Sequence, residues 1–260
     1  MAKSNLKEDD NLPATIDEVS ALAEQDAGRG ASQSSDDKFF PLISIIQKLS
    51  PQADRSASEH IDGAEPGDIY LRNFTPPIIP GDEGIVVQPC KMYVEYVEWV
   101  PRERGGGMAG RHLKRPKEAK VSPDGFKMTM PSGNDLKETR VWVVNLVTPD
   151  GATPFLIPCA STLNTFARAW NTAITQKKEP NGTDSPAWRY LWRLTTKQRK
   201  NAKGAWSVFS FAEERKVTTT QEYLLGRALC SSVEEAIEKG QQLAEAVEFE
   251  NVSKDEDPPF

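Results

Sequence analysis

Apolar residues outnumber polar ones along residues 91–100 and occur at both odd and even positions. Tyr93, Val97 and Trp99 fall on one face of an extended segment, and Met92 and Val94 fall on the other, because successive side chains of a strand point to opposite faces. Both faces carry apolar residues, so we predict a central strand. Shorter runs of β-branched and aromatic residues predict strands at 39–46, 69–74, 85–88, 140–147, 154–158, 188–195 and 205–211.

Turn and helix signals connect these strands. Residues 148–151 (Thr-Pro-Asp-Gly) predict a hairpin turn, because proline presets φ and glycine accepts a positive φ. Ser161 is a credible N-cap for a helix that carries Phe166, Trp170 and Ile174 on one face. Two further short helices are predicted at 218–230 and 233–247.

About seven short strands with one embedded helix predict a mainly β, α+β fold. The count fits a barrel of the oligonucleotide/oligosaccharide-binding (OB) type with additional elements, and a β-sandwich fits it nearly as well. The sequence leaves these two architectures open.

The formal net charge of −6 is unevenly distributed. Residues 1–37 carry −6, residues 38–230 carry +7 and residues 231–260 carry −7. The first segment has no aromatic residue and is rich in acids, which predicts a disordered acidic arm. We therefore predict an OB-like nucleic-acid-binding domain at 38–230, followed at 231–260 by an acidic helix and a protein-interaction tail. The alternative is that the acidic ends only keep the domain soluble.

A basic loop is predicted after the strand at 91–100. Residues 102–120 contain 7 basic and 2 acidic residues, with glycines and prolines that break regular structure. Mobile cations beside a sheet can follow a phosphate backbone without reading its sequence, although an exposed, solvated insertion has the same composition. The predicted DNA-binding residues of this loop are Arg102, Arg104, Arg111, Lys114, Arg115 and Lys117.

A second predicted hairpin, formed by 188–195 and 205–211, combines aromatic rings with cations. Trp188, Tyr190 and Trp192 alternate onto one face of the first strand. Such rings can stack on bases if they face solvent, and they belong to the core if they do not. The predicted DNA-binding residues here are these three rings together with Arg193, Lys197, Arg199, Lys200 and Lys203.

Catalytic and cofactor patterns are weak. Three Cys and two His have no zinc-site spacing. Cys159, before a predicted helix, is the best candidate nucleophile, but neither His has a group to orient it as a base. The glycines at 105, 107 and 110 match a dinucleotide fingerprint only formally, because Pro116 follows too soon for the required helix. We expect no enzyme, no cofactor and no metal. Because no apolar run approaches a membrane span, we expect a soluble, cytoplasmic protein.

The chain ends in Asp255-Glu256-Asp257-Pro258-Pro259-Phe260. This end resembles the C-terminal tip of bacterial single-stranded DNA-binding proteins, in which three Asp precede an apolar residue, Pro and Phe; Pro258 stands where that family usually has Ile. The resemblance covers these six residues only. It implies a docking peptide for replication and repair proteins, in which Asp255, Glu256 and Asp257 meet a basic ridge and Phe260, after Pro259, fills an apolar pocket.

These features predict a non-enzymatic protein of a bacteriophage or bacterium that binds and protects single-stranded DNA without sequence preference. It would act in replication, recombination and repair, and its tip would recruit partner proteins. The oligomeric state stays open and includes a homo-oligomer. One alternative is a phage interaction protein whose tip is a decoy for host replication and repair proteins, without DNA affinity. Another is a virion component with neither activity.

Overall fold

The computed structural model describes residues 40–243 apart from 124, 126, 203 and 242. All of them belong to one compact unit, Phe39–Phe260. The predicted arm at 1–37 and the C-terminal tip at 255–260 lie outside the described residues.

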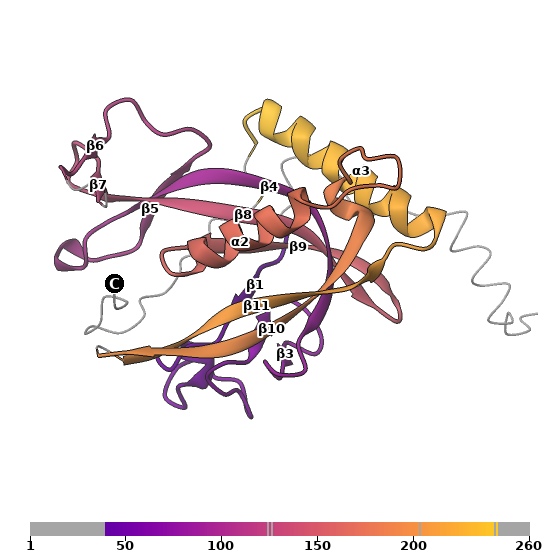
Figure 1. Cartoon of the computed structure of the whole chain (residues 1–260). Coiled ribbons are helices and arrows are strands. Elements are labelled where there is room, and N and C mark those ends of the chain that lie inside the picture. Colours follow the sequence, from indigo (N-terminus) through magenta and orange to yellow (C-terminus); the bar gives the residue numbers. More distant parts are fainter. Residues whose placement is uncertain (1–39, 124, 126, 203, 242, 244–260) are drawn as a thin grey trace, which may run out of the picture. The chain divides into compact units, whose positions relative to one another are not determined.

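The larger of two sheets is antiparallel and has eight strands in the described part of the chain. Its centre is the long pair β4 and β8, and β10 and β11 continue the sheet beyond β4 while β9 pairs with β8 (Figure 1). β5 pairs with the distal half of β4, and β7 joins β6 to β8 at the same end. The strands are β4 (Ile85–Trp99), β5 (Met108–His112), β6 (Lys120–Val121), β7 (Met128–Thr129), β8 (Asp135–Thr148), β9 (Gly151–Ala160), β10 (Tyr190–Asn201) and β11 (Gly204–Lys216).

A smaller sheet of three short strands packs against the larger one. Its strands are β1 (Ile43–Ile45), β2 (Ile69–Leu71) and β3 (Ile78–Ile79). A single parallel bridge joins Leu42 to Leu156 of β9. On the other side, the Gln47 side-chain amide donates to the carbonyl of Ser207 in β11 at 2.9 Å and accepts from its N–H at 3.0 Å. The side-chain amide of Gln47 therefore makes the pair of hydrogen bonds with β11 that the backbone of a neighbouring strand would otherwise make.

The chain before β4 also meets β10 closely. The N–H of Thr196 donates to the carbonyl of Gly81 at 2.7 Å, and its hydroxyl donates to the carbonyl of Gly67. A Cβ at Gly81 would lie 2.1 Å from the carbonyl oxygen of Gly67. Only glycine fits at this crossing, because no real Cβ approaches an oxygen so closely.

Two helices cover the two faces of the β4–β8 pair. α2 (Leu163–Thr175) buries Phe166, Trp170 and Ile174 on one face, and α3 (Thr220–Glu238) buries Leu229 and Val233 on the other. The connections between the described elements contain three single-turn 3₁₀ helices: η2 (Pro51–Ala53), η3 (Arg102–Arg104) and η4 (Ala187–Arg189).

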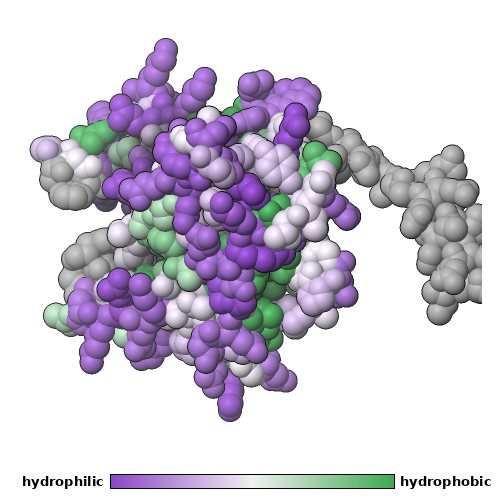
Figure 2. All heavy atoms as spheres, turned by 45° about the vertical axis from the view of Figure 1, so that its right-hand side comes forward, coloured by the Kyte–Doolittle hydropathy of each residue, from purple (hydrophilic) through white to green (hydrophobic). Residues whose placement is uncertain are grey.

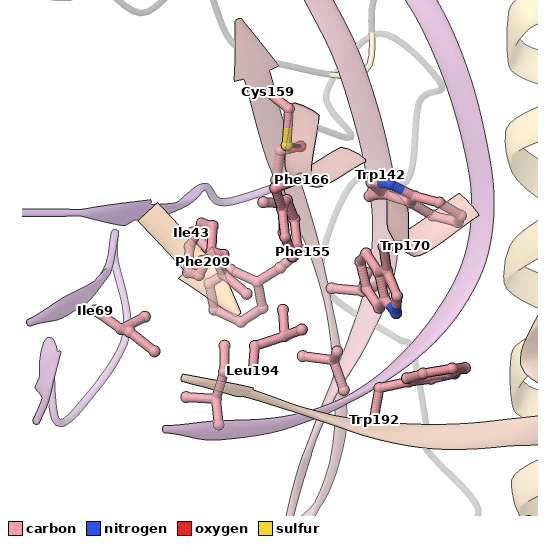
Figure 3. Packing of buried hydrophobic residues seen from close by; sticks show 14 of the residues in the cluster. Ile43, Ile69, Trp142, Phe155, Cys159, Phe166, Trp170, Trp192, Leu194 and Phe209 are labelled. Carbon is pink, nitrogen blue, oxygen red and sulfur yellow. Dashed lines mark hydrogen bonds between the residues drawn. The ribbon is translucent and has the colours of Figure 1, made fainter. Parts of the chain in front are cut away.

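The core beneath α2 is strongly aromatic. Trp142 and Trp170 have ring centroids 4.7 Å apart, and Trp192 meets Trp170 edge to face at 6.4 Å (Figure 3). Phe166 packs on Phe209 of β11 at 5.4 Å. This cluster joins α2 to strands from both halves of the large sheet and fixes the inner face of the β10–β11 hairpin.

The mainly β, α+β class, the hairpin turn at 148–151 and the embedded helix are confirmed. The strands predicted at 85–88 and 91–100 are one strand, β4, with a bulge between Pro89 and Lys91. A bulge lets the ladder continue past a residue that has no N–H.

Four details differ from the sequence predictions. The two sheets are not closed into a barrel in the described residues. The basic loop is not wholly irregular, because it contains β5. The N-cap of α2 is Thr162, while Ser161 takes a positive φ of 49° before it. The two helices predicted around residue 230 are one helix, α3, whose buried Val233 belongs to the same core as Leu229.

Candidate nucleic-acid interface

The β10–β11 hairpin presents two different faces because its residues alternate. Leu194 and Thr196 lie opposite Phe211 and Phe209, so these positions face the aromatic core. Lys197 and Arg199 lie on the other face, opposite Val208 and Trp206. The strands run on past the core, so the cations predicted in a loop stand instead on paired strands near the distal turn.

Tyr190 and Trp192 are core residues, 4% and 3% exposed. The Lys177 ammonium lies over both rings, 5.3 Å and 5.7 Å from their centroids. The prediction that these two rings form a base-stacking surface is therefore wrong. Strand alternation groups rings on one face, but it does not say whether that face meets the core or the solvent.

Trp188 does not share the face of Tyr190 and Trp192. It lies in η4 and packs edge to face on Tyr223 of α3, with ring centroids 6.1 Å apart. Its carbonyl accepts a hydrogen bond from the side-chain amide of Gln88 at 3.0 Å. This half-buried ring helps to dock α3, which makes a stacking role unsuitable for it.

Arg193 is held by an acidic partner on the neighbouring strand. Its guanidinium meets both carboxylate oxygens of Glu214, at 2.9 Å and 3.0 Å, in a two-pronged ion pair. These hydrogen bonds hold the pKa of Glu214 below its usual range and raise the pKa of Arg193. A phosphate would have to compete with a carboxylate for this guanidinium.

The distal hairpin cations, Lys197, Arg199 and Lys200, are exposed. Lys197 makes only a long contact, 3.5 Å, to the hydroxyl of Ser210. The sequence from Ser185 to Ala212 contains no Asp or Glu, so any carboxylate near these cations must come from another part of the chain. Lys203 lies outside the described residues.

Two arginines of the basic loop are structural. Arg104 donates to the carbonyl of Ser132 at 2.8 Å and to the side chain of Asn134 at 2.6 Å, which ties η3 to the turn before β8. Arg111 of β5 pairs with Glu95 of β4, and both side chains are only 5% exposed. Burial raises the pKa of Glu95, opposed by the neighbouring Arg111 guanidinium.

The exposed cations of the loop include Lys114, Arg115 and Lys117, which follow β5. Arg102 is also exposed, in η3. Figure 1 shows the β5–β7 end of the long strands and the distal turn of β10–β11 on the same, left-hand side. Figure 2 shows a molecular face that is mostly hydrophilic, with hydrophobic residues in separate patches.

The sequence prediction overlooked Trp206. This ring is half-buried on β11, directly across from Arg199. The alternation of side chains along the strand could have identified it. Phe209 and Phe211 share one face of the strand, so Trp206, three residues before Phe209, must lie on the other face.

The structure offers no support for the candidate nucleophile. Cys159 is fully buried, and burial raises the pKa of its thiol far above the ordinary value. No group of three potential metal ligands occurs among the described residues. No helix in the described ranges is long and apolar enough to cross a membrane.

A family model for Pam3 phage gp34-like proteins matches residues 9–239. The chain belongs to that family. The match supports a bacteriophage origin, one of the two origins that the sequence predicted. No curated protein and no solved structure matches the chain. The family match ends before the C-terminal tip and does not connect this gp34-like protein with single-stranded DNA-binding proteins.

Proposed function

We propose that this gp34-like phage protein binds single-stranded DNA without sequence preference and without catalysis. The observation that carries the proposal is the distal hairpin group, Lys197, Arg199 and Lys200, which is exposed on an acid-free stretch. The exposed loop cations Lys114, Arg115 and Lys117 form a second group that would extend the path of the DNA backbone.

Phosphate contacts supply most of the affinity in this proposal. Each phosphate that a Lys or Arg neutralises releases counterions from the strand, so affinity falls as salt rises. Since Tyr190 and Trp192 are buried, base stacking contributes less than the sequence suggested. A strong salt dependence with little base preference is the expected signature.

The C-terminal tip, Asp255 to Phe260, supplies the second half of the proposal. It would recruit replication, recombination or repair proteins in the cytoplasm of the bacterial host. The support is the sequence resemblance alone, since the tip lies outside both the described residues and the family match.

The test is to add the protein stepwise to labelled oligo-dT and to measure binding by fluorescence anisotropy, at low and at moderate salt. The matched variants are Arg199→Ala/Lys200→Ala on the hairpin and Arg227→Ala/Lys239→Ala on α3 and its C-cap, all exposed cations. We expect the hairpin variant to bind more weakly, with a slope of log affinity against log salt that is shallower by about 1.4, from about 0.7 per phosphate on a single strand. The α3 variant should match the wild type.

Equal losses in the two double variants would mean that only overall charge matters and would remove the hairpin from the site. No binding at either salt would reject the DNA proposal. It would favour the decoy alternative, in which the tip captures host proteins without any DNA affinity, and residues 255–260 would then serve as bait.

A further inference from the structure

Trp206 stands apart from the other tryptophans in the described hairpin and core. Trp142, Trp170 and Trp192 pack together, and Trp188 packs on Tyr223. Trp206 lies half-buried on the outer face of β11, its indole nitrogen is buried, and within the described residues no other aromatic ring stacks on it. One indole is thus placed on a strand surface without a protein ring to stack on.

Its neighbours on that face are cations. Arg199 is the register partner of Trp206, and Lys197 is the register partner of Val208, the next residue of β11 on the same face. Directly opposed residues of an antiparallel pair have Cβ atoms about 4.5–5.5 Å apart, and diagonal neighbours lie about 7–8 Å apart. The long side chains of Arg199 and Lys197 can therefore place two positive charges beside the Trp206 ring.

We propose that Trp206 is a base-stacking site, with Arg199 and Lys197 on the phosphates that flank the stacked nucleotide. The inference rests on the proposed DNA binding and adds the group that contacts a base. Every base has a π face, so such a site accepts any sequence. The competing explanation is that Trp206 only covers Val208, which is 8% exposed.

The experiment compares two labelled ligands of equal length, oligo-dT and an abasic deoxyribose-phosphate oligomer, at one low salt concentration. Both carry the same phosphates, and only the first can stack. The proteins are the wild type, Trp206→Ala, Trp206→Phe and, as a control, Leu225→Ala, which truncates an exposed apolar side chain on α3. Thermal melts confirm that each variant is folded.

We expect the wild type to prefer oligo-dT by about 5- to 150-fold, the range for one stacked base. Trp206→Ala should lose that preference and keep its affinity for the abasic oligomer, whereas Trp206→Phe should retain most of the preference. A preference that is absent in the wild type, or unchanged in Trp206→Ala, would overturn the stacking site while leaving phosphate binding intact. A wild type that binds neither oligomer would reject the proposed function itself.

Intrinsic fluorescence gives a second readout that separates contact from fold stability. Stacking on a base quenches the fluorescence of the indole involved. When oligo-dT binds, Trp206→Phe should therefore show less fluorescence quenching than the wild type, although it still binds the oligomer. Identical quenching in Trp206→Phe and wild type, at equal saturation, would show that the ring does not meet a base.

Discussion

At the scale of single residues, the buried ion pair between Arg111 and Glu95 determines how the basic loop is held. A charge that is 5% exposed is tolerated only with its partner in place. We predict that Arg111→Ala destabilises the fold by about 3–5 kcal/mol, because it leaves the Glu95 carboxylate buried and unpaired. Urea unfolding would measure the loss.

The same variant has a defined pH dependence. Burial already raises the pKa of Glu95, and without Arg111 nothing opposes this effect, so protonation relieves the penalty. The deficit of Arg111→Ala should be full at neutral pH and should shrink as pH falls through the raised pKa of Glu95. A deficit independent of pH would contradict the assignment.

A double replacement tests whether Arg111 serves stability or DNA binding. Glu95→Leu/Arg111→Met substitutes apolar side chains for both charges and should recover most of the lost stability. Because Arg111 is buried, the double variant should also keep the affinity of the wild type for oligo-dT. Weaker DNA binding by this folded variant would show that Arg111 does contribute to DNA binding, as the sequence alone predicted.

At the scale of elements, α3 depends on its N-terminus. The Thr219 hydroxyl accepts the N–H of Glu222 at 3.2 Å, and the Glu222 carboxylate accepts the N–H of Thr218 and pairs with Arg215. The hydrogen bonds from Arg215 hold the pKa of Glu222 below its usual 4.5. The carboxylate therefore stabilises α3 at pH values above 4.5, and this contribution is lost as pH falls through the lowered pKa.

We predict that Glu222→Gln lowers the stability at neutral pH by about 0.5–1 kcal/mol, through the lost helix-dipole and ion-pair interactions. The difference from wild type should disappear in acid, where Glu222 is neutral in both states. Thermal melts across this pH range would measure it. The control is Glu238→Gln at the C-terminal end of α3, which removes one negative charge far from the N-cap. It should not reproduce the loss of stability at neutral pH.

Sequence patterns predicted the elements whose signal is local. The turn at 148–151 and the buried face of α2 follow from turn chemistry and helical spacing. The break expected near residue 230 does not occur, because Ser231 and Ser232 are exposed on α3 while Val233 packs in the core. Tertiary burial therefore kept a helix intact where propensity alone favoured an end.

The candidate site was less predictable, because the role of each cation and ring depends on partners far away in sequence. Arg111 and Arg193 look alike in the sequence, yet one is buried against Glu95 and the other is clamped by Glu214. Trp192 and Trp206 both lie on strands of the hairpin but on opposite faces of it. The side of a strand that meets a core is settled by long-range packing, which alternation cannot show.

At the scale of the whole molecule, the charge segregation has a measurable consequence. Residues 38–230 carry +7 and residues 231–260 carry −7. On the proposed function, an acidic segment tethered to a basic domain competes with DNA for the same cations. Deleting residues 255–260 removes three acids, Asp255, Glu256 and Asp257.

We predict that the deletion leaves the affinity for oligo-dT unchanged or raises it by at most about fivefold for each acid removed, since an exposed charge pair contributes at most about 1 kcal/mol. Capture of host replication and repair proteins should be lost. Phe260→Ala keeps all three acids, so it should lose partner capture while its DNA affinity stays that of the wild type. This pair of variants separates the charge of the tip from its aromatic anchor, and weaker DNA binding by the deletion would show that the tip assists rather than competes with DNA.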